Sequence, residues 1–274
     1  AGVWYNRDMV RGPGKQMYLN ENGVMGGSAY TTEIIGFNSD GFILGTDNGV
    51  NASSGTYVSY NFLANNTTGS SNTDGTITST VSANTTSGFS IVKYTGTGSA
   101  STIGHGLGSA PKMVIVKPIS TSGVWITWHT GISINGQLQL QTTDAVYNPG
   151  TGIYWNSTLP TSSVFSVGTS GASNGSGTEY IAYCFAEKQG YSKFGSYVGN
   201  GNADGPFIYT GFKPAFVISK MTSSADNWVI QDNQRLTYNT TGYTLNPNAN
   251  NVENTNYPLD ILSNGFKQRT ANAT

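Results

Sequence analysis

The acidic side chains are the first candidates for chemistry in this sequence, because a pair of carboxylates can hydrolyse a glycosidic bond. That reaction needs two carboxyl groups about 5–9.5 Å apart, one of them with a raised pKa. The acids here are scattered over predicted turns and strand ends. Asp8 and Asp232 are equivalent in an internal repeat, yet its middle copy has His129 at that position. This substitution argues against a catalytic acid. We expect a non-enzymatic protein, with a polysaccharide depolymerase as the least favoured alternative.

Nucleophilic catalysis has few candidate residues. His105 lies in the loop sequence GHGLGSAP, and His129 follows Trp128 at a predicted strand end. No segment shows a helical pattern, so the sequence does not predict a nucleophile elbow, which leads into a helix. Cys184 sits in the alternating pattern YIAYCFAE. We interpret the histidines as hydrogen-bonded loop or strand-end residues, and Cys184 as a small buried apolar side chain.

The segment NGNADG at 200–205 matches the opening of a calcium-binding loop. Its oxygen donors would be Asn200, Asn202 and Asp204. The glutamate that closes an EF-hand loop is absent, since Gly211 occupies that position. A hairpin turn with glycine at positive φ explains the same residues. We favour the turn, keep a weak Ca²⁺ site as the alternative, and predict no other cofactor.

Sugar binding needs no shifted pKa, only aromatic faces and amides that converge on one surface. Trp4, Trp125 and Trp228 recur at repeat-equivalent positions and are expected to anchor the core. Other aromatic residues lie in stretches that do not recur, so they are the better candidates for a glycan-binding surface, although half or more of them could simply pack. These candidates are Trp128, Tyr147, Tyr154 and Trp155.

An internal repeat organises the chain. Residues 94–129 align without a gap with 197–232, and residues 42–64 align with 165–187. We predict the back part of a first module (1–64), a polar Gly/Ser/Thr/Asn linker (65–87), a complete second module (88–188), and a third module lacking its last strand (189–274). The incomplete modules have two interpretations. Either the sequence is an excerpt of a longer array, or a strand from a neighbouring subunit fills an open edge.

Composition favours β structure. Charged residues make up 10% of the chain, and 36 of its 274 residues are Gly. Strand patterns such as KMVIVK and EYIAYCF are separated by turn residues at intervals of roughly ten residues. We predict an all-β fold of tandem antiparallel β-sandwich modules of about 100 residues each. The net charge of −1 provides no basic stripe for nucleic acid, and no run reaches the about 18 apolar residues of a membrane span.

The passage AYCFAEKQGYSKFGSYVGNGNADGPFIYTGFKPAFVISK, followed by SADNWVIQD and ILSNGFKQR, resembles a repeated domain of large structural proteins of marine bacteriophages. The passages YTGTGSASTIGHGLGSAPKMVIVK and NGSGTEYIAYCFAE are similar to the same family. The resemblance covers 88–274 and the part-module at 3–64. It implies a concanavalin- or laminin-G-like jelly roll in a virion protein, and it carries over no catalytic residue.

The resemblance implies a bacteriophage virion structural protein, exposed on the particle as a tail fibre, spike or capsid-surface component. Its expected function is attachment to host-surface glycans. Its expected partners are further copies of itself, as a homo-oligomer, or other virion proteins, without nucleic-acid binding or membrane insertion. The alternative is a purely structural module that joins subunits through strand edges.

Overall fold

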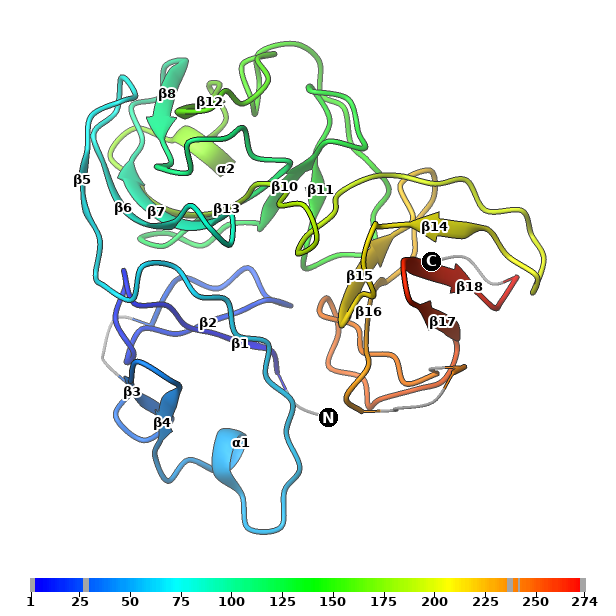
Figure 1. Ribbon diagram of the computed structural model, residues 1–274. Helices are drawn as coiled ribbons and strands as arrows, with labels where there is room; N and C mark the ends of the chain where they lie inside the picture. The colour runs from blue at the N-terminus through cyan, green and yellow to red at the C-terminus, as the bar shows by residue number, and fades with distance from the viewer. Residues whose placement is uncertain (1–2, 27–29, 236–238, 241, 272–274) are drawn as a thin grey trace.

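The computed structural model describes residues 3–26, 30–235, 239–240 and 242–271. The outer ends of the first and third predicted modules, residues 1–2 and 272–274, therefore lie outside the described residues. The chain forms three lobes that meet near the centre of the molecule (Figure 1). We call them the N lobe, the middle lobe and the C lobe. Nearly all regular structure is β and antiparallel, which confirms the predicted fold class.

The middle lobe is built on a seven-stranded antiparallel sheet in the order β11-β10-β9-β13-β7-β6-β5. Its strands are β5 (Ser70–Asn72), β6 (Ser79–Asn84), β7 (Phe89–Thr95), β9 (Met113–Pro118), β10 (Ile126–His129), β11 (Leu138–Gln139) and β13 (Glu179–Phe185). Strand β13 pairs with β7 along one edge and with β9 along the other. It is therefore the central strand of the sheet.

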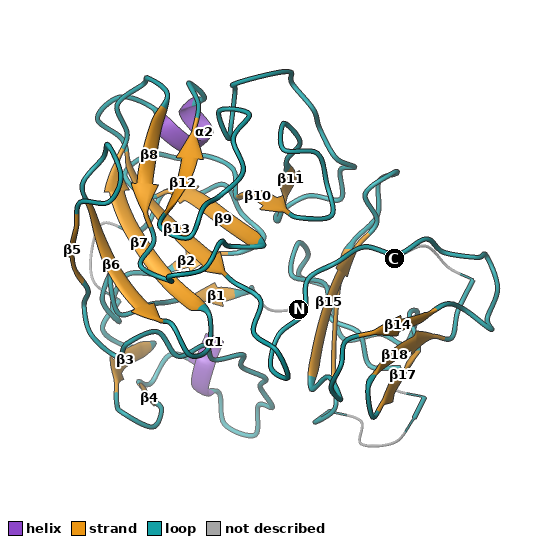
Figure 2. Ribbon diagram, turned by 45° about the horizontal axis from the view of Figure 1, so that its top comes forward, coloured by secondary structure: helices purple, strands orange, loops and turns teal. Residues whose placement is uncertain are grey.

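A second layer covers one face of this sheet. It consists of the strand pair β8 (Ser101–Gly104) and β12 (Val164–Val167), together with the single helical turn α2 (Gly171–Asn174) (Figure 2). Ile103 and Phe165 of this layer belong to one buried cluster with Val92, Val116 and Tyr180 of the sheet. This cluster is the core of a two-layer sandwich.

The opposite face of the same sheet is also buried. Successive strand residues point to opposite faces, and Ile181 and Tyr183 of β13 belong to a second cluster rather than to the sandwich core. That cluster includes Met17 from the N lobe and Trp228 from the C lobe. The middle lobe thus uses the other two lobes to cover the second face of its sheet.

The N and C lobes have smaller sheets. The N lobe contains the hairpin-like pairs β1 (Tyr5–Asn6) with β2 (Met17–Tyr18) and β3 (Ile34–Phe37) with β4 (Phe42–Leu44), followed by the helical turn α1 (Asn48–Asn51). The C lobe contains β14 (Phe207–Tyr209), β15 (Phe216–Lys220), β16 (Trp228–Asp232), β17 (Leu259–Leu262) and β18 (Gly265–Gln268). Both described helices are single turns, so neither could cross a membrane.

Segments that align in sequence have the same local pairing. His129 lies opposite Met113 in the β9–β10 pair, and the aligned residues Asp232 and Phe216 lie opposite each other in the β15–β16 pair. The helical turns α1 and α2 also begin at aligned positions, and each has a cap whose side chain accepts a hydrogen bond from the backbone two residues on. The division into tandem sandwich modules remains a prediction, because the two outer lobes do not repeat the large sheet.

One sequence-based assignment was wrong, and one sequence alignment does not correspond to a shared strand. Residues 65–87, predicted to be a linker, contain β5 and β6, and β6 pairs with β7 from Thr80 to Asn84. Their serine and threonine side chains suit a strand, and the Ser79 hydroxyl donates a hydrogen bond to the Gly104 carbonyl at 3.0 Å. Residues 57–63 were aligned with β13, but they form no strand here. A central strand requires two neighbours, and the N lobe offers no counterpart of β7 or β9 among the described residues.

Candidate functional site

The same type of hydrogen bond occurs at three places in the junction between the lobes. In each case the indole N–H of a recurring tryptophan donates to a backbone carbonyl of another lobe. The bonds run from Trp4 to Asn246 at 3.0 Å, from Trp125 to Tyr18 at 2.9 Å, and from Trp228 to Gln139 at 3.0 Å. The N lobe thus contacts the C lobe, the C lobe contacts the middle lobe, and the middle lobe contacts the N lobe. The three bonds form a closed cycle.

The three acceptor carbonyls also occupy equivalent positions. Tyr18 pairs with Tyr5, and Gln139 pairs with Ile126, in each case opposite the residue that follows the recurring tryptophan. In the C lobe the corresponding pairing is the antiparallel bridge between Ile230 and Leu245. Val229, which follows Trp228, comes just before Ile230, and Asn246 comes just after Leu245, so these two residues lie opposite each other in the same register. The junction therefore has pseudo-threefold symmetry within one chain. Head-to-tail contacts of this kind form a ring when the rotation closes.

A buried ionic cluster accompanies the tryptophan bond between the middle and N lobes. The Tyr183 hydroxyl lies 2.6 Å from Asp8 Oδ2, and Arg11 Nε donates to the same oxygen at 2.5 Å. Arg11 Nη1 also donates to the Lys15 carbonyl at 3.0 Å, and Nη2 donates to the Asn6 carbonyl at 3.2 Å. Every charged group in this cluster thus has hydrogen-bonding partners.

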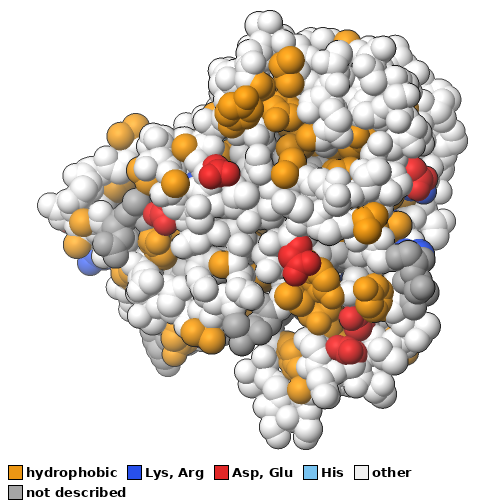
Figure 3. All heavy atoms as spheres, turned by 180° about the vertical axis from the view of Figure 1, so that it is seen from behind, with side chains coloured by type: hydrophobic (Ala, Val, Ile, Leu, Met, Phe, Trp, Pro, Cys, Tyr) orange, Lys and Arg blue, Asp and Glu red, His pale blue; other side chains and the backbone are white. Residues whose placement is uncertain are grey.

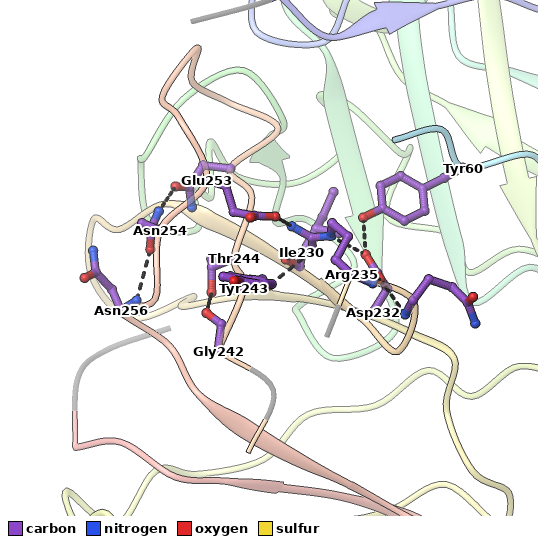
Figure 4. A network of polar contacts seen from close by, with 12 residues as sticks. Tyr60, Ile230, Asp232, Arg235, Gly242, Tyr243, Thr244, Glu253, Asn254 and Asn256 are labelled. Atoms are coloured by element: carbon purple, nitrogen blue, oxygen red, sulfur yellow. Dashed lines mark hydrogen bonds and ion pairs between the residues drawn. The ribbon is translucent and has the colours of Figure 1, made fainter. Parts of the chain in front are cut away.

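The same cluster recurs between the N and C lobes (Figure 4). Tyr60 donates to Asp232 Oδ2 at 2.7 Å, and Arg235 Nε donates to that oxygen at 2.6 Å. Arg235 also donates to the carbonyls of Ile230 and Tyr243, which correspond to those of Asn6 and Lys15. Its Nη1 donates to Glu253 at 2.6 Å, a contact specific to the C lobe.

Electrostatics holds both clusters in their charged, hydrogen-bonded form. Burial alone would lower the pKa of Arg11, but the Asp8 carboxylate reverses the effect and the pKa ends above its ordinary value. Burial alone would raise the pKa of Asp232, yet hydrogen bonds from Arg235 and Tyr60 bring it below its ordinary value. Burial also raises the pKa of Tyr183, which keeps its hydroxyl protonated and able to donate.

Each tyrosine stacks on the tryptophan that reaches the same neighbouring lobe. The rings of Trp125 and Tyr183 lie 6.4 Å apart at 20°, and those of Trp4 and Tyr60 lie 6.4 Å apart at 14°. One stacked pair therefore makes two hydrogen bonds to the next lobe. We call this arrangement of a stacked tryptophan and tyrosine, the carbonyl and the carboxylate a clasp.

The third interface, between the C and middle lobes, has only part of a clasp. The Trp228 bond is present, but His129 and Ile132 stand where the other copies have aspartate and arginine. His129 Nδ1 accepts a hydrogen bond from the Gly131 N–H at 2.9 Å. Its ring lies 6.1 Å from that of Phe194. Among the described residues, no tyrosine ring stacks on Trp228.

Two repeat-equivalent lysines, one buried and one half-buried, add a second recurring contact. Lys117 is 0% exposed and donates to the Gly23 carbonyl of the N lobe at 2.8 Å. Lys220, its repeat equivalent, donates to the Thr143 carbonyl of the middle lobe at 3.2 Å. Burial, followed by the like charge of Arg11, lowers the pKa of Lys117 to about 8. Carbonyl groups, rather than a carboxylate, therefore hold this ammonium.

Two of the four candidate residues for glycan binding are buried. Trp128 and Trp155 are each 3% exposed and belong to the sandwich core. They line a cavity of about 10 Å³, which has room for about one water molecule rather than a sugar ring. Tyr147 is exposed and Tyr154 is half-buried. Trp128 and Thr127 are successive residues of β10, so their side chains point to opposite faces of the sheet. The Trp128 side chain lies in the sandwich core. Because Trp128 does not recur in the other copies of the repeat, the sequence did not show which face of this strand is covered.

The segment 200–205 forms a bend and not the predicted hairpin turn, because β14 pairs with β18 and no described strand directly precedes the segment. The side-chain oxygen of Asn200 accepts the Asn202 N–H at 3.1 Å, and that of Asn202 accepts the Asp204 N–H at 2.8 Å. The Asp204 carboxylate lies 2.7 Å from Lys267 Nζ and 3.6 Å from Arg269 Nη1. The three predicted donors already serve backbone amides and cations. This arrangement opposes binding of a further cation there.

The clasp residues were only partly visible in the sequence. The recurring tryptophans were predicted to be buried. Trp125 and Trp228 are buried, whereas Trp4 is only half-buried. The clasp tyrosines and arginines were missed, although the signal was present. Tyr60 aligns with Tyr183 in the same offset that aligns Phe62 with Phe185, and Arg11 follows Asp8 at the spacing at which Arg235 follows Asp232.

Comparison with known families places the chain in one of them. A family model described as a domain of unknown function, DUF7483, matches residues 3–274, so the chain belongs to this family. No curated protein and no solved structure matches the chain. The family match spans all three lobes and the junction between them.

Proposed function

We propose that this chain is a non-enzymatic structural component of a bacteriophage virion, such as part of a tail fibre, a spike or a capsid-surface protein. The phage context is supported by the resemblance of its repeated passages to phage structural proteins. The structural role is supported mainly by the closed cycle of tryptophan bonds at the junction. These bonds link residues that are far apart in the chain, and so they oppose separation of the lobes.

Energetics favours a rigid unit. Trp125 and Trp228 are almost completely buried at lobe contacts, and burying an aromatic ring is among the largest single contributions to an interface. Each buried clasp carboxylate has an arginine and a tyrosine as partners. Separating two lobes would expose the ring and leave a charge without its partners, which is costly. A particle component exposed to mechanical force gains from this resistance.

The surface fits a scaffold better than a dedicated sugar-binding site. Hydrophobic side chains form separate patches within a largely neutral polar surface, and few charged groups are visible on this face (Figure 3). A cavity lined by Gln16, Tyr18, Glu21 and Tyr30 encloses about 70 Å³, whereas typical small-molecule sites enclose about 300–1,000 Å³. With Trp128 and Trp155 inside the core, we favour structural assembly over glycan attachment.

Immunogold labelling of purified phage particles tests the proposal. An antibody raised against the 274-residue chain should decorate intact particles of a phage that encodes it, at a regular position. Finding the chain only in infected-cell lysate, and never in purified particles, would overturn the proposal. Release of reducing sugar from host polysaccharide by the purified chain would instead support the depolymerase alternative.

A further inference from the structure

The Asn–Gly dipeptides of this chain can react with themselves. Because glycine has no side chain, its backbone nitrogen is unshielded and can attack the side-chain amide of the preceding asparagine. The reaction needs a free glycine N–H, an asparagine side chain that can turn toward it, and stabilisation of the negative charge that forms on the peptide group. The dipeptide occurs six times, at Asn22, Asn48, Asn135, Asn174, Asn200 and Asn264.

Four of the six dipeptides are held by the fold. Gly49, Gly136 and Gly175 each donate their N–H to an oxygen atom, at 2.7, 2.9 and 2.7 Å. Gly265 is a paired residue of β18, and an added Cβ there would collide with the Ile208 carbonyl. A nitrogen that is bonded or enclosed in this way does not reach the asparagine side chain.

The two other dipeptides, Asn22–Gly23 and Asn200–Gly201, are both exposed. Neither glycine N–H has a hydrogen-bond acceptor among the described residues. Their asparagine side chains differ. The Asn200 amide donates to the Asp204 carbonyl at 2.9 Å and accepts the Asn202 N–H at 3.1 Å. The Asn22 amide has no partner in the described part of the chain, so it is free to turn.

The peptide group between Asn22 and Gly23 is also polarised. Its oxygen, the Asn22 carbonyl, accepts the Gly123 N–H at 2.9 Å and lies 3.5 Å from Lys117 Nζ. Lys117 also donates to the Gly23 carbonyl at 2.8 Å, which holds the ammonium beside this segment. When Gly23 loses its proton, negative charge spreads onto the Asn22 oxygen, and preorganised donors stabilise such charge. The Asn200 carbonyl has no donor among the described residues.

We propose that Asn22 is a self-modification site, at which the folded chain converts asparagine to aspartate and isoaspartate. The Gly23 nitrogen loses its proton to hydroxide and attacks Cγ of Asn22. The N–Cγ bond forms, the Cγ–Nδ2 bond breaks, and Nδ2 takes a proton from water and leaves as ammonia. Water then opens the succinimide ring at either carbonyl. The ring has room, because an added Cβ on Gly23 would meet only Glu21 Oε2 within 4 Å, at 3.9 Å.

The modification acts on the contact between the N lobe and the middle lobe. Isoaspartate lengthens the main chain by a methylene group, which displaces the Asn22 and Gly23 carbonyls from Lys117. The buried ammonium then loses acceptors, and leaving a buried donor unsatisfied is costly. Lys117 should therefore become accessible to acylating reagents as the chain ages. This inference does not depend on the virion role.

A comparison within one molecule tests the proposal. The intact 274-residue chain is incubated at neutral pH, folded or in urea, and asparagine conversion is followed by mass spectrometry. Digestion after glutamate releases residues 22–33, and digestion after lysine releases residues 194–213, so each site is measured in its own peptide. A single preorganised donor in an enzyme contributes about 10²–10³ in rate, so at this exposed site we expect Asn22 to react at least about tenfold faster than Asn200 in the folded chain. The rates should become similar in urea. Equal or slower reaction of Asn22 in the folded chain overturns the proposal.

Substitutions separate the donor from the rest of the fold. Lys117→Met should slow the reaction of Asn22 by roughly two- to tenfold, which corresponds to one hydrogen bond, without changing that of Asn200. Lys117→Arg keeps a donor and should retain most of the rate. An unchanged rate in Lys117→Met would refute the role of the ammonium. Acetylation of Lys117 should increase with age in the wild type but not in Asn22→Gln, and an equal increase in both would refute the effect on the lobe contact.

Discussion

The hydroxyl of Tyr183, on the central strand of the large sheet, lies 2.6 Å from the carboxylate of Asp8, which is 175 residues away in the chain. This contact joins the middle lobe to the N lobe, and Tyr60 with Asp232 repeats it between the N and C lobes at 2.7 Å. Two sequence-equivalent pairs therefore connect three lobes. Because the two tyrosine–aspartate pairs are equivalent, the same substitution can be made in each pair and its effects on stability compared.

Removing the tyrosine hydroxyl should weaken the junction. We expect Tyr183→Phe to lower the free energy of unfolding by about 1.5–3 kcal/mol, because the bond has a charged acceptor and is buried. Chemical denaturation measures this loss. In a double-mutant cycle, Tyr183→Phe should have a smaller effect when Asp8 is already Asn. Additive effects of the two substitutions would contradict a direct interaction.

The junction tryptophans should differ from an ordinary core tryptophan. Trp125→Phe removes packing and also leaves the Tyr18 carbonyl without its indole donor. Trp128 is the matched control, since its buried indole N–H has no hydrogen-bond partner among the described residues. We expect Trp125→Phe to be more destabilising than Trp128→Phe by about 1–3 kcal/mol. Thermal unfolding of both variants checks the order, and a reversed order would argue against the importance of the cycle.

The buried Arg11 should matter far more than an exposed ion pair. Arg11→Met leaves the buried Asp8 charge unpaired, so we expect a loss of about 3–5 kcal/mol. Lys93→Met breaks a partly exposed pair with Glu179, joined at 2.7 Å, and should cost less than about 1 kcal/mol. Adding Asp8→Asn to Arg11→Met should recover part of the loss. No recovery would indicate that the arginine acts through packing alone.

Lys117 should give stability an alkaline dependence. Its folded pKa of about 8 lies below its ordinary value of 10.5, so between these values the unfolded chain binds more protons than the folded one. Stability then rises with pH in that window. The wild type should gain stability relative to Lys117→Met between pH 8 and pH 10.5, when both are denatured with urea. Taking the difference removes titrations common to both proteins, and a flat difference would show that the folded pKa is not lowered.

The sequence by itself determined the fold class and the residues that recur. Alternating apolar and polar residues indicate strands because the side-chain period of a strand is two, and β13 shows this directly in EYIAYCF. The recurring tryptophans were predicted to be buried because each copy of the repeat has to cover the same position. The aligned positions of Tyr60 and Tyr183, and the shared spacing of Asp8–Arg11 and Asp232–Arg235, were also present in the sequence.

Only the tertiary structure decided which surfaces are covered and which lobe each recurring residue contacts. The alternation of apolar and polar residues defines two faces of a strand, but it does not show whether both faces are covered. Trp128 was therefore a candidate for a surface site, yet it is buried. In the same way, a polar segment predicted to be a linker is part of the large sheet. The tyrosine–aspartate bonds of the clasps join residues more than 170 positions apart. A local pattern cannot specify such contacts, because they depend on how the three lobes close around their common junction.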